Sequence, residues 1–210
     1  MNQDESWDAI AERRLAVARL LAQLTPAEWE KPSLCDGWRV RDVAAHLAMA
    51  PQPPGPLAMA AAAVRAGGRF HTMNHDLAVR WAERPTGDLV DELRRHAGSQ
   101  RLPSVTNYRN TLFDVTVHAQ DIAIPLGRPL PTPPETAVAA ALRVWEMGWP
   151  FRARRRFRGV RLIATDAGFA VGAGTEHRAP IETLLLLMTG RPDPASGIHK
   201  LCTQPVDNSN

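Results

Sequence analysis

Cysteine, lysine and tyrosine are scarce in this chain of 210 residues. It contains two cysteines, Cys35 and Cys202, and a single tyrosine, and arginine supplies nearly all of its basic side chains. Two cysteines so far apart form neither a disulfide framework nor a cysteine-based zinc ribbon, as is usual in a reducing cytosol. We therefore expect a cytoplasmic protein.

Long apolar runs are also missing. No stretch approaches the roughly 18 apolar residues that a membrane span requires. Residues 1–10 lack both the basic region and the apolar core of a signal peptide. Aromatic residues are few, and no nucleic-acid-binding motif is recognisable. The sequence therefore predicts a soluble protein that binds neither a membrane nor a nucleic acid.

The composition is otherwise that of an ordinary globular protein, with 44% hydrophobic and 22% charged residues. Its arginine-for-lysine bias fits a GC-rich bacterial genome. Most of the excess positive charge lies in one cluster, formed by Arg152, Arg154, Arg155, Arg156, Arg158 and Arg161. Such a cluster is either a solvated segment between two elements or a surface that attracts phosphates or an acidic partner.

The first part of the chain has the apolar spacing of amphipathic helices. Four or five helices joined by short connections indicate a helical bundle. Thr25 to Glu28 is typical of a capping box that starts a further short turn. The predicted helices cover residues 7–24, 39–49, 57–66, 74–98 with an interruption at 85–87, and 106–126.

The remainder has a different pattern. A proline-rich linker at 131–134 is followed by a helix, two strands joined by a hairpin turn, and a last helix, which together form a small α+β unit. The fold class is thus mainly α: a bundle over residues 1–128, a small α+β domain over 129–198, and a loose tail over 199–210. The elements of the second part are a helix over 134–147, strands over 160–164 and 169–171, and a helix over 180–189.

The most informative chemistry lies in the helix at 106–126. With about 100° of rotation per residue, two apolar stripes flank a narrow strip that holds Asp114, His118 and Asp121. Polar groups placed between apolar stripes point into the bundle, where ionisable side chains must be paired or bound to a metal. Asp114 and His118 are four residues apart, so they can share one divalent ion such as zinc.

A third ligand has to come from a facing helix, and His46 is the best candidate because it flanks the apolar stripe of the helix at 39–49. Three protein ligands would leave a coordination position open, as in catalytic sites. The alternatives are a satisfied core histidine and a structural ion pair of Asp114 with His118. A rival pair, His71 and His75, lies in a polar stretch without apolar stripes, and we expect it at the rim.

Three segments resemble the mycothiol-dependent maleylpyruvate isomerase family, which belongs to the DinB-like metal-dependent bundles. Residues 33–47, SLCDGWRVRDVAAHL, are similar to its CPGW(S/T)VRDVxxHL motif. Residues 117–127 are similar to its HxxDxxxxLG signature. Residues 178–191 are similar to its RGP…LLxxLTGR segment, within a small sterol-carrier-like domain. The resemblance covers residues 5–195, with the three motifs in the family's order.

The resemblance implies a metal triad at His46, Asp114 and His118, with aspartate in place of the family's glutamate. It also implies mycothiol, an actinobacterial thiol, as cosubstrate, activated as a metal-bound thiolate. Asp42 and Asp121 could orient the ligand imidazoles. They could equally be ordinary surface carboxylates. The motif alignment places neither cysteine at the metal.

The last segment of the resemblance ends on Arg191, which could bind a substrate carboxylate. An exposed arginine after a helix is also commonplace. We expect a monomer or homodimer whose partners are mycothiol and a small electrophile that the sequence does not name. Three functions stay open: a mycothiol-dependent S-transferase or isomerase, a non-enzymatic metal-binding or regulatory relative, and a metal-dependent hydrolase that uses bound water.

Overall fold

The computed structural model describes residues 1–52, 55–65, 70–102 and 106–191. The chain divides into two compact units, Met1–Pro131 and Thr132–Asn210. The division falls within the predicted proline-rich linker, just after the predicted boundary at residue 128. That each unit folds independently stays a proposal. The predicted tail, residues 199–210, lies outside the described residues.

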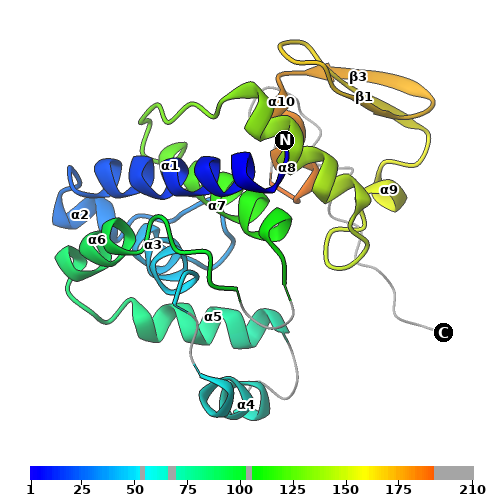
Figure 1. The fold of residues 1–210 in the computed structure, drawn as a ribbon. Helices are drawn as coiled ribbons and strands as arrows, with labels where there is room; N and C mark the ends of the chain where they lie inside the picture. Colours follow the sequence, from blue (N-terminus) through cyan, green and yellow to red (C-terminus); the bar gives the residue numbers. More distant parts are fainter. Residues whose placement is uncertain (53–54, 66–69, 103–105, 192–210) are drawn as a thin grey trace. The chain divides into compact units, whose positions relative to one another are not determined.

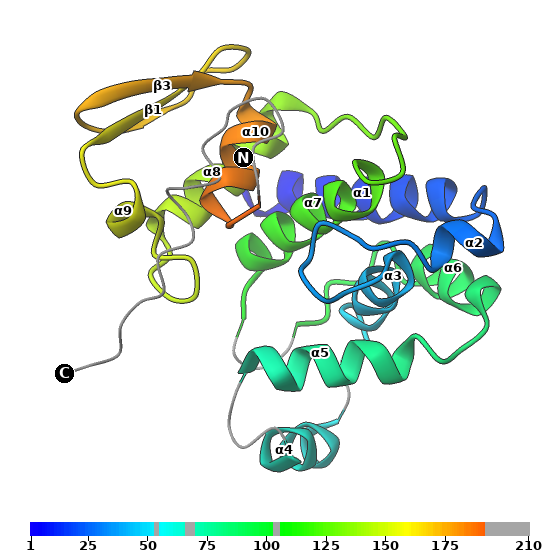
Figure 2. The same ribbon diagram turned by 180° about the vertical axis from the view of Figure 1, so that it is seen from behind.

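Four helices of the first unit close into a bundle. Helix α1 (Gln3–Leu21) packs against α6 (Thr86–Arg95) and α7 (Tyr108–Ala123), and α3 (Val40–Met49) packs against the same two helices. Figures 1 and 2 show this arrangement from opposite sides. Together with the small sheet in the second unit, the bundle confirms the predicted fold class. None of the helices in the described residues is long and apolar enough to cross a membrane.

Capping side chains set where the first helices begin. The Asn2 side chain accepts a hydrogen bond from the Glu5 amide, and the Glu5 carboxylate accepts one from the Asn2 amide. This reciprocal capping box starts α1 at Gln3, four residues before the predicted start, because the prediction followed apolar spacing alone. The predicted capping box of Thr25 and Glu28 does start the short helix α2 (Pro26–Trp29).

Two further helices flank the bundle. Helix α5 (Phe70–Trp81) packs against α3, and α4 (Pro56–Arg65) packs against α5. In both views α5 lies on the side of α3 away from α1. The predicted helical stretch at 74–98 is thus two helices, and Pro85 precedes the second because a proline cannot continue a helix interior.

The core of the first unit is apolar on the faces that the sequence predicts. Burying one such side chain stabilises the fold by about 1.5–3 kcal/mol. These contacts therefore fix α3 and α7 against each other, which matters because both helices carry candidate ligands. Its buried apolar side chains include Ile10, Val17, Leu21, Val43, Leu47, Leu89, Leu93, Leu112, Val115 and Ile122.

The second unit is a three-stranded sheet with helices. Strand β1 (Val160–Ala164) pairs antiparallel with β2 (Ala170–Gly172), which confirms the predicted hairpin, and parallel with β3 (Thr175–Ala179). Its remaining elements are α8 (Pro134–Glu146), α9 (Ala153–Arg156) and α10 (Ile181–Met188). Helix α10 packs against both α8 and β1.

Strand β3 was not predicted, because its sequence, TEHRA, lacks apolar alternation. The chain reaches it through Gly172 and Gly174, both with positive φ. A Cβ atom at Gly172 would lie 2.3 Å from the carbonyl oxygen of Val160, so only glycine fits this close approach. The six arginines of the basic cluster are all exposed. Arg156 also donates to the carbonyls of Leu187 and Met188 at the end of α10.

Candidate metal centre

The three predicted ligands lie together inside the bundle. His46 Nε2 lies 3.1 Å from Asp114 Oδ2, and His118 Nε2 lies 3.5 Å from Asp114 Oδ1. The two imidazole rings meet edge to face with 4.9 Å between their centroids. Asp114 therefore bridges two imidazoles from different helices. Its side chain is shorter than that of the family's glutamate, but it reaches both rings.

Helix geometry explains this convergence. His46 is carried by the buried face of α3, and Asp114 and His118 are one turn apart on α7, so the contact between the two helices brings the three together. The His46 and His118 side chains are 10% and 12% exposed, whereas that of Asp114 is 31% exposed. The site is thus buried on the histidine side and open at Asp114.

The donor set fits a divalent ion. One ligand atom from each of the three residues lies within 4.8 Å of the others. Zinc binds imidazole nitrogen and carboxylate oxygen at about 2.0–2.2 Å, which requires only small side-chain movements from this arrangement. Two nitrogens and one oxygen also suit other transition ions. Three protein ligands leave room for an exogenous one.

The two candidate orienting carboxylates differ. Asp121 is fully buried, and its Oδ2 lies 2.8 Å from His118 Nδ1, so it orients the ring as expected. Asp42 does not orient His46. Its carboxylate accepts hydrogen bonds from the Arg39 backbone amide and guanidinium at the start of α3. The expected role of Asp42 is therefore wrong, because a residue in the first turn of a helix serves as a cap.

Trp38 lies against the same imidazoles. Its ring is nearly parallel to that of His118, at 10° with centroids 6.3 Å apart, and meets His46 edge-on at 5.7 Å. Trp38 belongs to the motif at residues 33–47, but no role was predicted for it from the sequence. The neighbouring Cys35 was not expected at the metal. Its thiol is in fact a hydrogen-bond partner of His118, because residues 33–38 run alongside α7.

Buried charge governs the electrostatics of the site. Burial alone would raise the pKa of Asp114, but the facing imidazoles of His46 and His118 lower it well below its ordinary value. Burial alone would lower the pKa of His118, but Asp114 and Asp121 raise it well above the ordinary 6.5. Without a metal, these opposite pKa shifts favour a protonated His118 beside an ionised Asp114.

Arg14 is a further buried cation, and its charge interacts with that of Asp114. Burial lowers the pKa of Arg14 to about 10, partly offset by the charge of Asp114. The Arg14 guanidinium donates to the carbonyl oxygens of Ala97 and Ser99 at 2.9 and 2.8 Å, just after α6. Arg14 thus fixes the end of α6 and adds positive charge beside the ligand carboxylate.

Metal binding is expected to depend steeply on pH. A metal needs the free nitrogen of His118, so the ion must displace its proton. Asp114 is already ionised and contributes nothing to this dependence. Affinity should rise about tenfold per pH unit below the raised pKa of His118, with one proton released from His118 per ion. Calorimetry in buffers of different ionisation enthalpy measures this release, and an affinity that does not change with pH would contradict the assignment of His118.

The other candidate residues lie elsewhere in the described structure. His75 is on α5, with 42% of its side chain exposed, and it contacts the Trp38 ring rather than the three ligands. The side chain of His71 lies outside the described part of α5. Arg191 belongs to the second unit, where its guanidinium donates to the Thr189 carbonyl oxygen at 3.0 Å. Cys202 lies outside the described residues.

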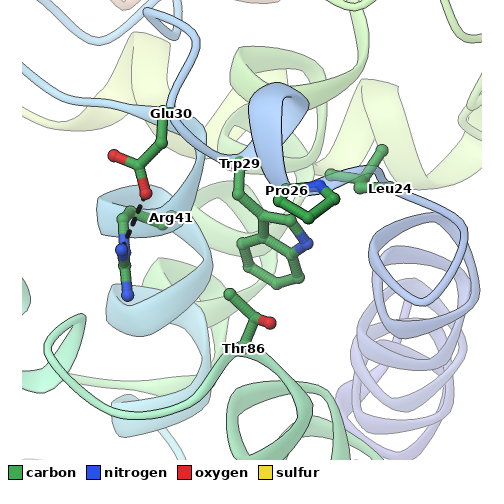
Figure 3. Close-up of a pocket in the computed structure, with 6 residues that line it drawn as sticks. All are labelled: Leu24, Pro26, Trp29, Glu30, Arg41 and Thr86. Carbon is green, nitrogen blue, oxygen red and sulfur yellow. Dashed lines mark hydrogen bonds and ion pairs between the residues drawn. The ribbon is translucent and has the colours of Figure 1, made fainter.

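A shallow pocket elsewhere in the first unit contains none of these residues. Figure 3 shows its lining, with the ion pair of Arg41 and Glu30 on one side and the buried Trp29 in the centre. None of the three ligands lines it, so it offers no alternative to the metal centre. Its lining residues are Leu24, Pro26, Trp29, Glu30, Arg41 and Thr86.

The fold and the converging ligands define a helical-bundle protein with a candidate metal centre. Residues 10–102 match the family model of the mycothiol maleylpyruvate isomerase N-terminal domain. This match supports the resemblance predicted from the motifs and contains the first of the three motifs, residues 33–47. The match contains His46, whereas Asp114 and His118 follow it along the chain.

Two solved structures share the fold along nearly the whole chain. Both are crystal structures of the mycothiol-dependent maleylpyruvate isomerase, one of them a histidine-to-alanine mutant. The mutant aligns with a TM-score of 0.60 and the other structure with 0.57, each at 13% identity over 92% of this chain and 91% of that chain. Among curated proteins, none matches the chain significantly.

Proposed function

We propose that this chain is a metal-dependent enzyme that uses mycothiol to attack a small electrophile, as an isomerase or an S-transferase. The observation that carries the proposal is the convergence of His46, Asp114 and His118 in a bundle whose residues 10–102 match the isomerase N-terminal domain model. We propose zinc as the ion. A mycothiol-using enzyme would act in the cytoplasm, where the thiol is kept reduced.

A divalent cation held by these residues would stabilise the thiolate of mycothiol over its thiol, and so supply a nucleophile at neutral pH. The protein's own contribution is positional. Asp121 fixes the ring of His118 through Nδ1, which leaves Nε2 directed toward Asp114. Trp38 stacks on the His118 ring and meets the His46 ring edge to face, and so restricts the rotation of both rings. The exposure of Asp114 leaves an approach for the thiol.

We propose that the electrophile is a small molecule with an activated double bond. Addition of the thiolate to that bond would give a carbanion: rotation and expulsion of the thiolate isomerise the bond, whereas protonation of the carbanion by solvent retains the adduct, which is S-transfer. Arg191, which matches the terminal arginine of the family segment, is proposed to bind a carboxylate of the electrophile. Maleylpyruvate, named in the titles of both structural relatives, is the first compound to test.

Turnover assays distinguish this proposal from the two alternative functions, a regulatory metal-binding protein and a hydrolase. Metal-loaded protein should convert maleylpyruvate only when mycothiol is added. Asp114→Ala should reduce the rate to that of the metal-free protein, whereas Asp114→Glu, which supplies the family's usual ligand, should retain it. Turnover without thiol would favour a hydrolase with bound water. Metal binding with no thiol effect would favour a regulatory relative.

A further inference from the structure

A second set of ligands lies next to the candidate centre and shares one residue with it. The Cys35 thiol, the His118 imidazole and the Asp121 carboxylate each offer an atom within 4.8 Å of the other two. His118 faces Asp114 through Nε2 and Asp121 through Nδ1. The carboxylates of the two sets, Asp114 and Asp121, therefore face different nitrogens of one imidazole ring.

The loop that carries Cys35 is held in place by its own hydrogen bonds. The Leu34 amide donates to the Asp121 carbonyl oxygen at 3.1 Å, which ties the loop to α7. The Cys35 amide donates to Ser33 Oγ at 3.1 Å, and Ser33 Oγ donates to the Trp38 carbonyl oxygen at 2.9 Å. The position of the thiol is thus built into the fold. Cys35 is half-buried, so solutes can reach it.

The chemistry of this second set differs from that of the first. Thiolate, imidazole and carboxylate together form a complete set of three protein ligands for a tetrahedral ion. Sulfur favours soft, thiophilic cations, whereas the first set contains only nitrogen and oxygen. Asp121 is fully buried, so a cation beside it would experience little screening by solvent.

We propose that Cys35, His118 and Asp121 form an alternative metal position that competes with the first site for His118 and is preferred by thiophilic ions such as Cd²⁺. A neutral imidazole has one free lone pair and one N–H, so it ligates a single ion at a time. Binding at the second position releases the proton of the Cys35 thiol and the Nδ1 proton of His118, and leaves the Nε2–H of His118 facing Asp114. This inference does not depend on the proposed reaction.

The test is a Cd²⁺ titration of the full chain with Cys202→Ser, which removes the other thiol, after the resident metal is stripped with a chelator. A thiolate-to-cadmium charge-transfer band should grow and saturate at one equivalent. The band should be lost with Cys35→Ser and retained with His46→Ala, which disables only the first site. Circular dichroism establishes that each variant is folded.

Three results would overturn the inference. The first is the absence of a thiolate band in the parent at saturating Cd²⁺. The second is a band that persists in Cys35→Ser. The third is a band that His46→Ala removes as completely as Cys35→Ser does. Saturation at two equivalents would contradict the competition for His118. None of these results bears on thiol-dependent turnover, so the failure of this inference and that of the proposed function remain distinguishable.

Discussion

His118→Ala is expected to leave the purified protein without its metal ion. His118 belongs to both ligand sets, so no alternative set of three remains. Losing an orienting partner of a ligand already weakens metal affinity about 10–100-fold, and losing the ligand itself costs more. His46→Ala should have the same effect once Cys35→Ser closes the alternative position. Elemental analysis of the purified variants measures the retained metal.

His75→Ala is the matched control. His75 is also a helical histidine in contact with Trp38, but 42% of its side chain is exposed and its ion-pair partner is Asp76 rather than Asp114. Its replacement should leave about one equivalent of metal in place, and so should His71→Ala. Full metal content in His118→Ala, or loss of metal in His75→Ala alone, would show that the ligands are assigned to the wrong residues.

Asp121→Asn is expected to weaken metal binding about 10–100-fold. The buried Asp121 carboxylate accepts from His118 Nδ1 at 2.8 Å, which fixes the ring and increases the basicity of the ligating nitrogen. An asparagine oxygen still accepts that bond but carries no charge, so the second effect is lost. Competition with a chromophoric chelator at fixed pH gives the affinity.

Asp42→Asn tests whether Asp42 only caps α3 or also orients a metal ligand, as Asp121 does. Asp42 is as buried as Asp121 and lies one turn from His46, but it is bonded to Arg39. Its replacement should cost about 1 kcal/mol of folding stability through the weakened cap of α3 and leave metal affinity unchanged. Equal losses of metal affinity in the two variants would contradict the distinct roles assigned to these carboxylates.

Local periodicity was sufficient to predict much of the site. Asp114 and His118 share a helix face by spacing alone, and the apolar stripes on either side indicated that this face is buried. His46 required only that its helix pack against the later one. The same argument predicted the bundle, since the apolar residues of α1, α3 and α7 mark the sides that meet.

Contacts that depend on caps and loops could not be predicted in this way. Asp42 has the spacing of a partner for His46, but its place in the first turn of α3 commits it to Arg39. Cys35 and Trp38 reach His118 only because a tight loop returns along α7, and no periodic pattern encodes that path. Strand β3 is polar and is defined by its pairing with β1.

Mycothiol titration of the cobalt-substituted protein shows directly whether the added thiol binds the metal. Cys35→Ser and Cys202→Ser should be introduced together, because Cys35 lies close enough to His118 to supply sulfur itself. With both thiols removed, a sulfur-to-cobalt charge-transfer band that grows with mycothiol requires a direct bond between the added thiol and the metal. We expect such a band, saturating at one thiol per cobalt ion and lost with Asp114→Ala. An unchanged spectrum at saturating mycothiol in a fully loaded sample would contradict this expectation.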